Sequence, residues 1–247
     1  MTRVPEGREF RPWPLHWRPE HVGRYWDWWS RNPALEHLYF SMRFGDALLD
    51  EIGRAIPLRG TLLDLGCGPG HLVAKALDRG LEALAVDQSA ESVKTLNDRL
   101  GSHPRFRGAK VNEGFPVPLS DGAADIVTVI ETVEHLDDAA LRALLDETHR
   151  LVRPGGHVVV STPHAENLPE LEVMCPDCGC VFHQFQHVRS FTPEALRSAM
   201  EARGFKTLRC RPTLLSFLPR WMQPFHRWVY PRVKGKLPHL IYVGQRA

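Results

Sequence analysis

The chain has 247 residues, 43% hydrophobic and 24% charged, a composition typical of one globular α/β domain with additions. Its net charge is only +2, although no acidic residue follows Glu201, and this balance argues against nucleic acid as a partner. No apolar run reaches the roughly eighteen residues of a membrane span, and the first residues resemble no signal peptide. The five cysteines are an odd number, so we expect a cytoplasmic protein without a disulfide framework.

The N-terminal region, residues 1–58, is predicted to form an aromatic-rich helical cap. Prolines make the first 20 or so residues irregular, and a helical pattern follows from residue 21 to residue 56. Four rings lie close together in it: Tyr25, Trp26, Trp28 and Trp29. These rings either pack the helix onto the core or form a lid over an apolar substrate, because binding pockets are mostly apolar and aromatic-lined.

Strands and helices alternate through the rest of the chain. Predicted strands cover residues 60–65, 81–86, 106–111, 124–130, 157–161, 205–209 and 240–243, and helices cover 73–79, 89–100, 138–151 and 194–202. This alternation predicts a doubly wound, mostly parallel, seven-stranded sheet of Rossmann-like architecture. We divide it into a core at 59–162, a Cys/His-rich insertion at 163–192, and a C-terminal part at 193–247 with a helix, a lid and the last strands.

The most informative stretch is the end of the first strand of this core. An apolar run ends in Asp64, and Gly66, Gly68 and Gly70 follow at alternating positions before a helix begins. Glycines let the backbone turn sharply and approach a ligand, and the helix N-terminus gives the crevice a positive end. A second acid, Asp87, ends the next strand, where a carboxylate can accept both hydroxyls of a ribose.

This D-x-G-x-G-x-G pattern resembles motif I of the class I S-adenosylmethionine-dependent methyltransferases more than the G-x-G-x-x-G of dinucleotide-binding proteins. The turn at residues 151–156 resembles a late motif of the same family, so the resemblance covers residues 60–162. It implies S-adenosylmethionine as cofactor. The implied cofactor-binding residues are Asp64, Gly66, Cys67, Gly68, Gly70, Asp87, Gln88, Asn112 and Glu131. Lys110 stands where many relatives carry an acid that meets the adenine, so adenine recognition is assigned to backbone groups or Asn112.

An acid–histidine cluster follows the fourth strand. Glu131, Glu134 and His135 point one way if they form a helical turn, and two carboxylates with an imidazole suit a divalent ion such as Mg, Mn, Fe or Zn. Alternatively, Glu131 is an ordinary residue after a strand and His135 a capping histidine. We predict His135 and Glu131 as catalytic residues, with His135 or a metal deprotonating the acceptor.

The spacing of this cluster, with His187 far downstream, resembles two metal-dependent O-methyltransferase groups. One comprises the ubiquinone-biosynthesis enzymes, and the other, more distant, methylates the ribose 2′-hydroxyl of small RNAs. In both groups the metal holds the acceptor hydroxyls beside the methyl donor. The resemblance implies that Glu131, Glu134, His135 and His187 are ligands here.

The insertion carries a second candidate metal site, for zinc. Cys175-Pro-Asp-Cys178-Gly resembles half of a zinc-ribbon knuckle, and Cys180 or His183 would complete the ligand set. We expect such a zinc to be structural and to brace the segment that carries His187. The alternative is that these are reduced cysteines in a loop.

The tail between residues 214 and 230 mixes aromatic and basic side chains. Such a segment closes an apolar pocket, packs on the core, or makes a peripheral membrane contact, and we favour the pocket. The first functional hypothesis is methyl transfer to a hydroxyl of a small apolar or aromatic acceptor. Ribose 2′-O methylation of RNA and a non-catalytic, zinc-braced binding module are the alternatives.

Overall fold

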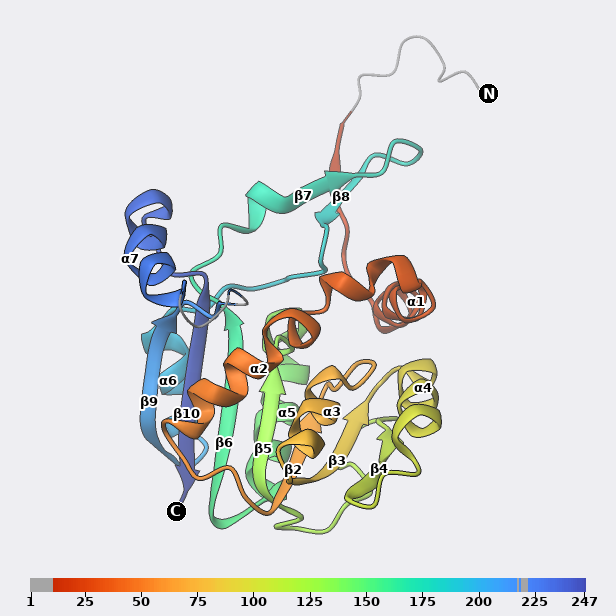
Figure 1. Cartoon of the computed structure of the whole chain (residues 1–247). Coiled ribbons are helices and arrows are strands. Elements are labelled where there is room, and N and C mark those ends of the chain that lie inside the picture. The colour runs from red at the N-terminus through yellow and green to blue at the C-terminus, as the bar shows by residue number, and fades with distance from the viewer. Residues whose placement is uncertain (1–10, 217, 219–221) are drawn as a thin grey trace.

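The computed structural model describes residues 11–216, 218 and 222–247, so the predictions for residues 1–10, 217 and 219–221 lie outside the described residues. A central sheet has helices on both faces, and a small second sheet stands above the ends of its strands (Figure 1). The layered arrangement follows from the strand–helix alternation of the sequence.

The central sheet has seven strands, and only β10 runs antiparallel to its neighbours. In spatial order they are β4 (Phe106–Val111), β3 (Glu82–Asp87), β2 (Thr61–Leu65), β5 (Ala124–Ile130), β6 (Val152–Pro163), β10 (His239–Arg246) and β9 (Phe205–Thr213). This arrangement confirms the predicted doubly wound, mostly parallel, Rossmann-like fold. Chain order reverses between β2 and β5, which makes the carboxyl ends of these two strands the expected ligand-binding crevice.

Apolar side chains on both faces of the sheet explain the continuous apolar runs of its inner strands. Leu62 packs with α2 (Phe40–Gly53) and α3 (His71–Asp78), whereas Leu63 packs with α5 (Asp138–Leu151) and α6 (Pro193–Glu201) on the other face. Both leucines are fully buried, because successive side chains of a strand point to opposite faces and both faces are covered. A further helix, α4 (Ala90–Leu100), contacts β3 and β4.

Local signals of the sequence set several element boundaries. The side chain of Ser89 accepts a hydrogen bond from the backbone N–H of Ser92 at the start of α4, and the side chain of Thr192 accepts one from Ala195 N–H at the start of α6. Two expectations differ. The predicted turn at residues 154–156 lies inside β6, which already begins at Val152 and pairs irregularly with β5 there.

The second difference concerns the predicted helix over residues 21–56, which is three helices. They are α1 (Pro19–Ser30), the 3-10 helix η1 (Pro33–Leu38) and α2. The first break falls at Pro33, which has no N–H to continue a helix and restricts the residue before it. The chain therefore changes direction twice before it enters the sheet.

The insertion between β6 and α6 stands at the carboxyl edge of the central sheet (Figure 1). It contains the short helix η3 (Leu168–Leu171) and the hairpin of β7 (Glu172–Met174) and β8 (Cys180–His183). Strand β1 (Trp13–Pro14) pairs parallel with β8, which joins the N-terminus to the insertion. The last helix, α7 (Gln223–Lys234), lies at the same edge. Among the described residues, no helix is both long and apolar enough to cross a membrane.

Candidate functional site

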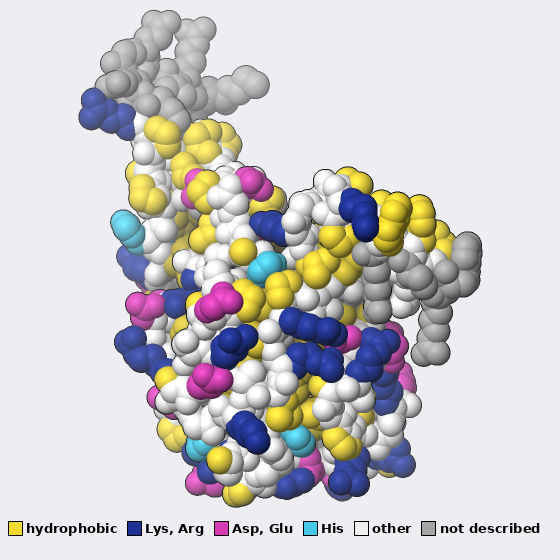
Figure 2. Space-filling view, turned by 90° about the vertical axis from the view of Figure 1, so that its left-hand side faces the viewer, with side chains coloured by type: hydrophobic (Ala, Val, Ile, Leu, Met, Phe, Trp, Pro, Cys, Tyr) yellow, Lys and Arg dark blue, Asp and Glu magenta, His cyan; other side chains and the backbone are white. Residues whose placement is uncertain are grey.

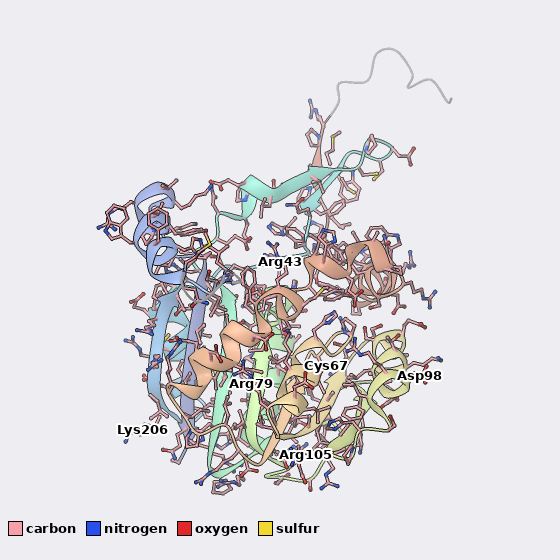
Figure 3. All side chains as sticks on the ribbon, in the orientation of Figure 1. Arg43, Cys67, Arg79, Asp98, Arg105 and Lys206 are labelled. Atoms are coloured by element: carbon pink, nitrogen blue, oxygen red, sulfur yellow. The ribbon has the colours of Figure 1, made fainter. Side chains whose placement is uncertain are left out.

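A cavity of about 450 Å³ opens at the carboxyl ends of β2, β3 and β5, within the size range of small-molecule sites. Segments from the turn after β2, α1, α2, the region after β5 and the insertion line it. Two lining residues, Arg43 and Cys67, are labelled in Figure 3, nearer the hairpin than Arg105 and Lys206 at the opposite edge of the sheet. The cavity therefore occupies the expected switch point.

One end of the cavity is formed by the glycine turn after β2. Gly66 has φ +80°, and a Cβ there would lie 2.6 Å from the hydroxyl of Thr132, so only glycine fits. The N–H of Gly68 donates to one carboxylate oxygen of Asp87 at 2.7 Å, and the N–H of Ser89 donates to the other at 2.8 Å. Asp87 thus ties the turn to the start of α4, and burial raises the pKa of its carboxyl.

Most of the predicted cofactor-binding residues line the cavity at this end: Gly66, Cys67, Gly68, Asp87, Gln88, Asn112 and Glu131. Asp64 and Gly70 lie beneath the turn instead. Asp64 is buried and accepts a hydrogen bond from the hydroxyl of Thr128 at 2.7 Å, and burial raises its pKa to about 7. Lys110 turns its ammonium to the carbonyl of Pro118 at 2.7 Å, away from the cavity that Asn112 lines.

The other end of the cavity is lined by aromatic rings from the N-terminal region. Trp26 and Trp29 of α1 contribute, whereas Trp28 of the same helix is 57% exposed. The ring of Tyr39 lies nearer the glycine turn, beside Gly68. Trp29 is also part of the buried core. One helix therefore packs a ring on the core and lines the cavity with its rings, and their role as a lid over a substrate stays a prediction.

An acid–histidine group lies beside these rings, where η2 (Val133–His135) follows β5 and the His135 ring meets that of Trp26. One ligand atom each of Glu134, His135 and His187 lies within 4.8 Å of the others. Glu134 is 1% exposed, and neither of its carboxylate oxygens has a hydrogen-bond partner of normal geometry among the described residues. The backbone N–H of Val188 donates to the carbonyl of Glu134 at 2.9 Å, which holds the insertion against η2.

The electrostatics of this group follow from its burial. Burial raises the pKa of Glu134 well above its usual value and lowers that of His135 to about 3. Nδ1 of His135 lies 3.4 Å from the carbonyl of Gln186, which leaves Nε2 toward Glu134 at 3.9 Å. Glu131, also predicted as a ligand, is not part of this group of ligand atoms. One of its oxygens accepts a hydrogen bond from the hydroxyl of Ser161 at 2.7 Å. Burial raises the pKa of Glu131 to about 7.

Backbone strain is concentrated around this group. Glu131, Ala165 and Gln186 have φ values of 48°, 46° and 60°, and they are the non-glycine residues with positive φ in the described chain. Such conformations cost on the order of 1–3 kcal/mol each and persist where the surroundings fix them. Gln186 is fully buried; its amide N–H donates to the carbonyl of His135 at 2.9 Å, and its amide oxygen accepts from the indole N–H of Trp26 at 3.0 Å.

Sequence reasoning missed Gln186, which is not part of any of the motifs described above. It also missed Glu166, which lies beside His183 and His187. The only local signal was the sequence Gln-His that places Gln186 next to a predicted ligand.

The thiol groups of the insertion form a separate cluster. The Sγ atoms of Cys175, Cys178 and Cys180 lie within 4.8 Å of one another. Backbone N–H groups of Cys178 and Asp177 point at the Cys175 sulfur and lower its thiol pKa. His183, which was predicted as a zinc ligand, belongs to the group with Glu166 and His187 instead.

Comparisons with known proteins agree with this fold. The sequence model of a family described as "Methyltransferase domain" matches residues 36–209. The chain belongs to this family, and it has the fold and the motif I turn of a class I S-adenosylmethionine-dependent methyltransferase.

Two curated relatives and one solved structure illustrate the similarity. A malonyl-[acyl-carrier protein] O-methyltransferase of Salmonella typhimurium is 31% identical over 176 residues, 70% of this chain and 64% of that protein. A ubiquinone biosynthesis O-methyltransferase of Pseudomonas paraeruginosa is 29% identical over 136 residues, 55% of this chain and 57% of that protein. The match thus spans less than two thirds of these relatives.

The solved structure is a geranyl diphosphate C-methyltransferase of Streptomyces coelicolor A3(2), in complex with Mg²⁺, geranyl diphosphate and S-adenosyl-L-homocysteine. It superposes with a TM-score of 0.65 at 18% identity, over 95% of this chain and 100% of that chain. At this identity the similarity establishes the fold.

Proposed function

We propose that the protein transfers a methyl group from S-adenosylmethionine to a hydroxyl of a small apolar or aromatic acceptor, assisted by a divalent metal ion. One observation carries this function: a single cavity joins the glycine turn and Asp87 to the Glu134–His135–His187 group beneath aromatic rings. The two curated relatives that are named O-methyltransferases favour oxygen as the acceptor atom.

The residues at the glycine turn fit the methyl donor. Gly66 and Gly68 leave the backbone bare, and Asp87 offers carboxylate oxygens at the end of β3, where a ribose would lie. The hydroxyl of Tyr39 is buried near Gly68 without a hydrogen-bond partner of normal geometry among the described residues, so it is available to a polar ligand. S-adenosylmethionine supplies an already activated methyl group, so the protein mainly has to align donor and acceptor.

The residues after β5 fit a divalent ion. Two buried carboxylate oxygens of Glu134 that have no hydrogen-bond partner of normal geometry among the described residues are costly, and a cation between Glu134, His135 and His187 would satisfy them. Bound there, the ion would act as a Lewis acid that lowers the pKa of an acceptor hydroxyl. Glu131, with its pKa raised to about 7, is placed to hold the acceptor proton near neutral pH.

Titration of S-adenosylhomocysteine by calorimetry tests the donor site. We expect Asp87→Ala to weaken binding by about 10- to 100-fold, the effect of losing a charge-assisted hydrogen bond. Asp98→Ala is the matched control, because Asp98 is exposed on α4 and pairs with Lys94 at 2.6 Å. Absence of binding to the unmodified protein, or equal losses in both variants, would contradict the donor site.

Titration of Mn²⁺ into chelator-treated protein tests the metal site. We expect Glu134→Gln to lower the affinity by more than about 100-fold, because it removes the carboxylate at the centre of the group. Glu131→Gln is the control that separates the two acids, since Glu131 lies outside the group. If Glu131→Gln alone abolishes binding, the ion lies elsewhere.

We also propose a structural zinc at Cys175, Cys178 and Cys180. The hairpin turn that carries them receives hydrogen bonds from Trp13: its backbone N–H donates to the carbonyl of Gly179 at 3.2 Å and its indole N–H to the carbonyl of Cys178 at 3.0 Å. A zinc there would brace the attachment of the N-terminus. Purified protein should hold about one zinc per chain. Cys175→Ser should lose it, and Cys210→Ser should keep it.

The helix α7 supports a proposed peripheral contact with an anionic membrane surface. Phe225, Trp228 and Val233 are exposed, and the guanidinium of Arg232 lies over the Trp228 ring. Figure 2 shows the face beside α7, where hydrophobic side chains gather next to Lys and Arg side chains. Binding to phosphatidylserine vesicles that is lost in Trp228→Ser would support this contact, and equal binding to neutral vesicles would contradict the role of charge.

Turnover assays separate the main function from its alternatives. Transfer of a labelled methyl group to phenols or alcohols supports a small acceptor, whereas transfer to short RNA alone would favour ribose methylation. The small positive net charge argues against RNA. Donor binding without transfer to any acceptor would favour a binding module. We also propose a cytoplasmic location, which the odd number of cysteines in the sequence favours.

A further inference from the structure

Glu166 lies against His187, which lines the cavity, in a position that no motif in the sequence marked. It follows β6, directly after Ala165, whose φ is +46°. The N–H of Ala165 donates to the carbonyl of Phe191 at 2.9 Å, and the ammonium of Lys236 donates to the carbonyl of Ala165 at 2.9 Å. The strained backbone directs the Glu166 side chain, 14% exposed, toward His183 and His187.

The hydrogen bonds of His183 determine where its ring carries a proton. Its Nδ1 lies 3.2 Å from the backbone N–H groups of both Phe185 and His187, so this nitrogen is an acceptor. The neutral ring therefore carries its proton on Nε2, which lies 3.6 Å from Glu166 Oε1. A ring protonated at Nε2 has no lone pair there for a metal, and this N–H has no hydrogen-bond partner among the described residues.

The contact between His187 and Glu166 shows which ring nitrogen of His187 carries the proton. Nδ1 of His187 lies 2.5 Å from Glu166 Oε2, a distance that admits a hydrogen bond and leaves no space for an ion between the two atoms. Nδ1 carries the proton, and the lone pair of the neutral ring lies on Nε2. The ring stacks on His183 with centroids 4.4 Å apart and meets the His135 ring at 4.9 Å.

We propose that Glu166 is a positioning residue that fixes the tautomer of His187, so that the Nε2 lone pair joins Glu134 and His135. The Nε2–H of His183 faces the second carboxylate oxygen from 3.6 Å, which is longer than a hydrogen bond, and contributes only a favourable electrostatic contact. A carboxylate behind a ligating histidine orients the ring and raises its basicity. The proposal rests on the proposed function only for the ion that this lone pair would bind.

Long-range ¹H–¹⁵N NMR of the histidine rings tests the tautomer in the metal-free protein. We expect His187, assigned by comparison with His187→Gln, to carry its proton on Nδ1. In Glu166→Gln the amide oxygen faces the N–H of His183, and the amide N–H₂ then faces Nδ1 of His187. The His187 proton should therefore move to Nε2. The control is Glu170→Gln, because Glu170 is exposed in the same insertion and bonds only locally to Asn167.

Two NMR results would overturn the proposal. One is a His187 ring protonated at Nε2 in the unmodified protein, and the other is an unchanged tautomer in Glu166→Gln. Glu166→Asp, which keeps a carboxylate, should retain the Nδ1 proton and thereby shows that the effect does not come from disturbed folding.

The affinity for Mn²⁺, measured by calorimetry, provides a second readout. We expect Glu166→Gln to lower it about 10- to 100-fold while the affinity for S-adenosylhomocysteine stays unchanged. Equal Mn²⁺ affinity in both proteins would count against the positioning role. If the unmodified protein binds no Mn²⁺, the proposed metal site fails, and the NMR result alone still decides the role of Glu166.

Discussion

The two ends of the cavity are built in different ways. The donor end consists of a turn and one carboxylate that lie within about 25 residues of each other along the chain, and its shape is set by backbone N–H groups held by Asp87. The acceptor end collects side chains from α1, η2, the turn after β6 and the loop after β8. One end is thus fixed by backbone geometry and the other by a network of side-chain hydrogen bonds.

This difference predicts how each end responds to substitution. A backbone turn that only glycine fits has no intermediate state, so a single added carbon should remove donor binding. A network of side chains can lose one hydrogen bond and keep the others, so its losses should be graded.

The largest effect is expected for Gly66→Ala at the donor end. The added Cβ would lie 2.6 Å from the Thr132 hydroxyl, at a φ of +80° that L-residues disfavour by about 1–2 kcal/mol. Calorimetry should show S-adenosylhomocysteine affinity lowered on the order of 1,000-fold, about 4 kcal/mol. The control is Gly108→Ala, which has φ +105° but nothing within 4 Å of its added Cβ.

The two glycine variants separate strain from collision. If Gly108→Ala lowers donor affinity as much as Gly66→Ala does, the cause is backbone strain from a positive φ anywhere in the domain. The shape of the donor end would then not depend on the local turn. If Gly66→Ala binds normally, the turn rearranges and the contrast between the two ends disappears.

A smaller effect, on the free energy of unfolding, is expected from the buried carboxyl of Asp64 beneath the donor turn. Burial raises the pKa of Asp64 to about 7 from 3.8, so folding favours its protonated form. The stability that this provides is complete below the unfolded pKa and is lost as pH rises through about 7. Between pH 5 and pH 8 the free energy of unfolding should fall by about 2–3 kcal/mol on this account.

Urea unfolding at several pH values measures this loss. Asp64→Asn keeps an oxygen that can accept from Thr128 but has no charge, so its stability should fall less over the same pH range. Asp125→Asn is a suitable comparison, because the pKa of Asp125 is lowered by hydrogen bonds from Thr61 N–H and Arg153. If the free energy of unfolding changes with pH in the same way in the unmodified protein and in Asp64→Asn, the pKa of Asp64 is not raised by burial.

The same contrast explains what the sequence could predict. The fold was predictable because the inner strands are buried on both faces and therefore read as apolar runs, and the glycine turn because its parts are adjacent along the chain. The roles of Gln186 and Glu166 were not predictable, because each depends on partners 20 to 160 residues away. A positive φ at Gln186 has no signature in its residue type.

The smallest effect is expected where α1 is attached to the acceptor end. Trp26→Phe keeps a ring against His135, whose centroid lies 4.9 Å away, but removes the N–H that donates to the amide oxygen of Gln186 at 3.0 Å. Losing one such hydrogen bond costs about 1 kcal/mol, so acceptor KM should rise less than about tenfold while donor affinity stays constant. The control is Trp28→Phe on the exposed side of the same helix. A fall in donor affinity in Trp26→Phe would mean that the two ends of the cavity are coupled through α1. The side-chain network would then also hold the glycine turn, which we expect the backbone to fix alone.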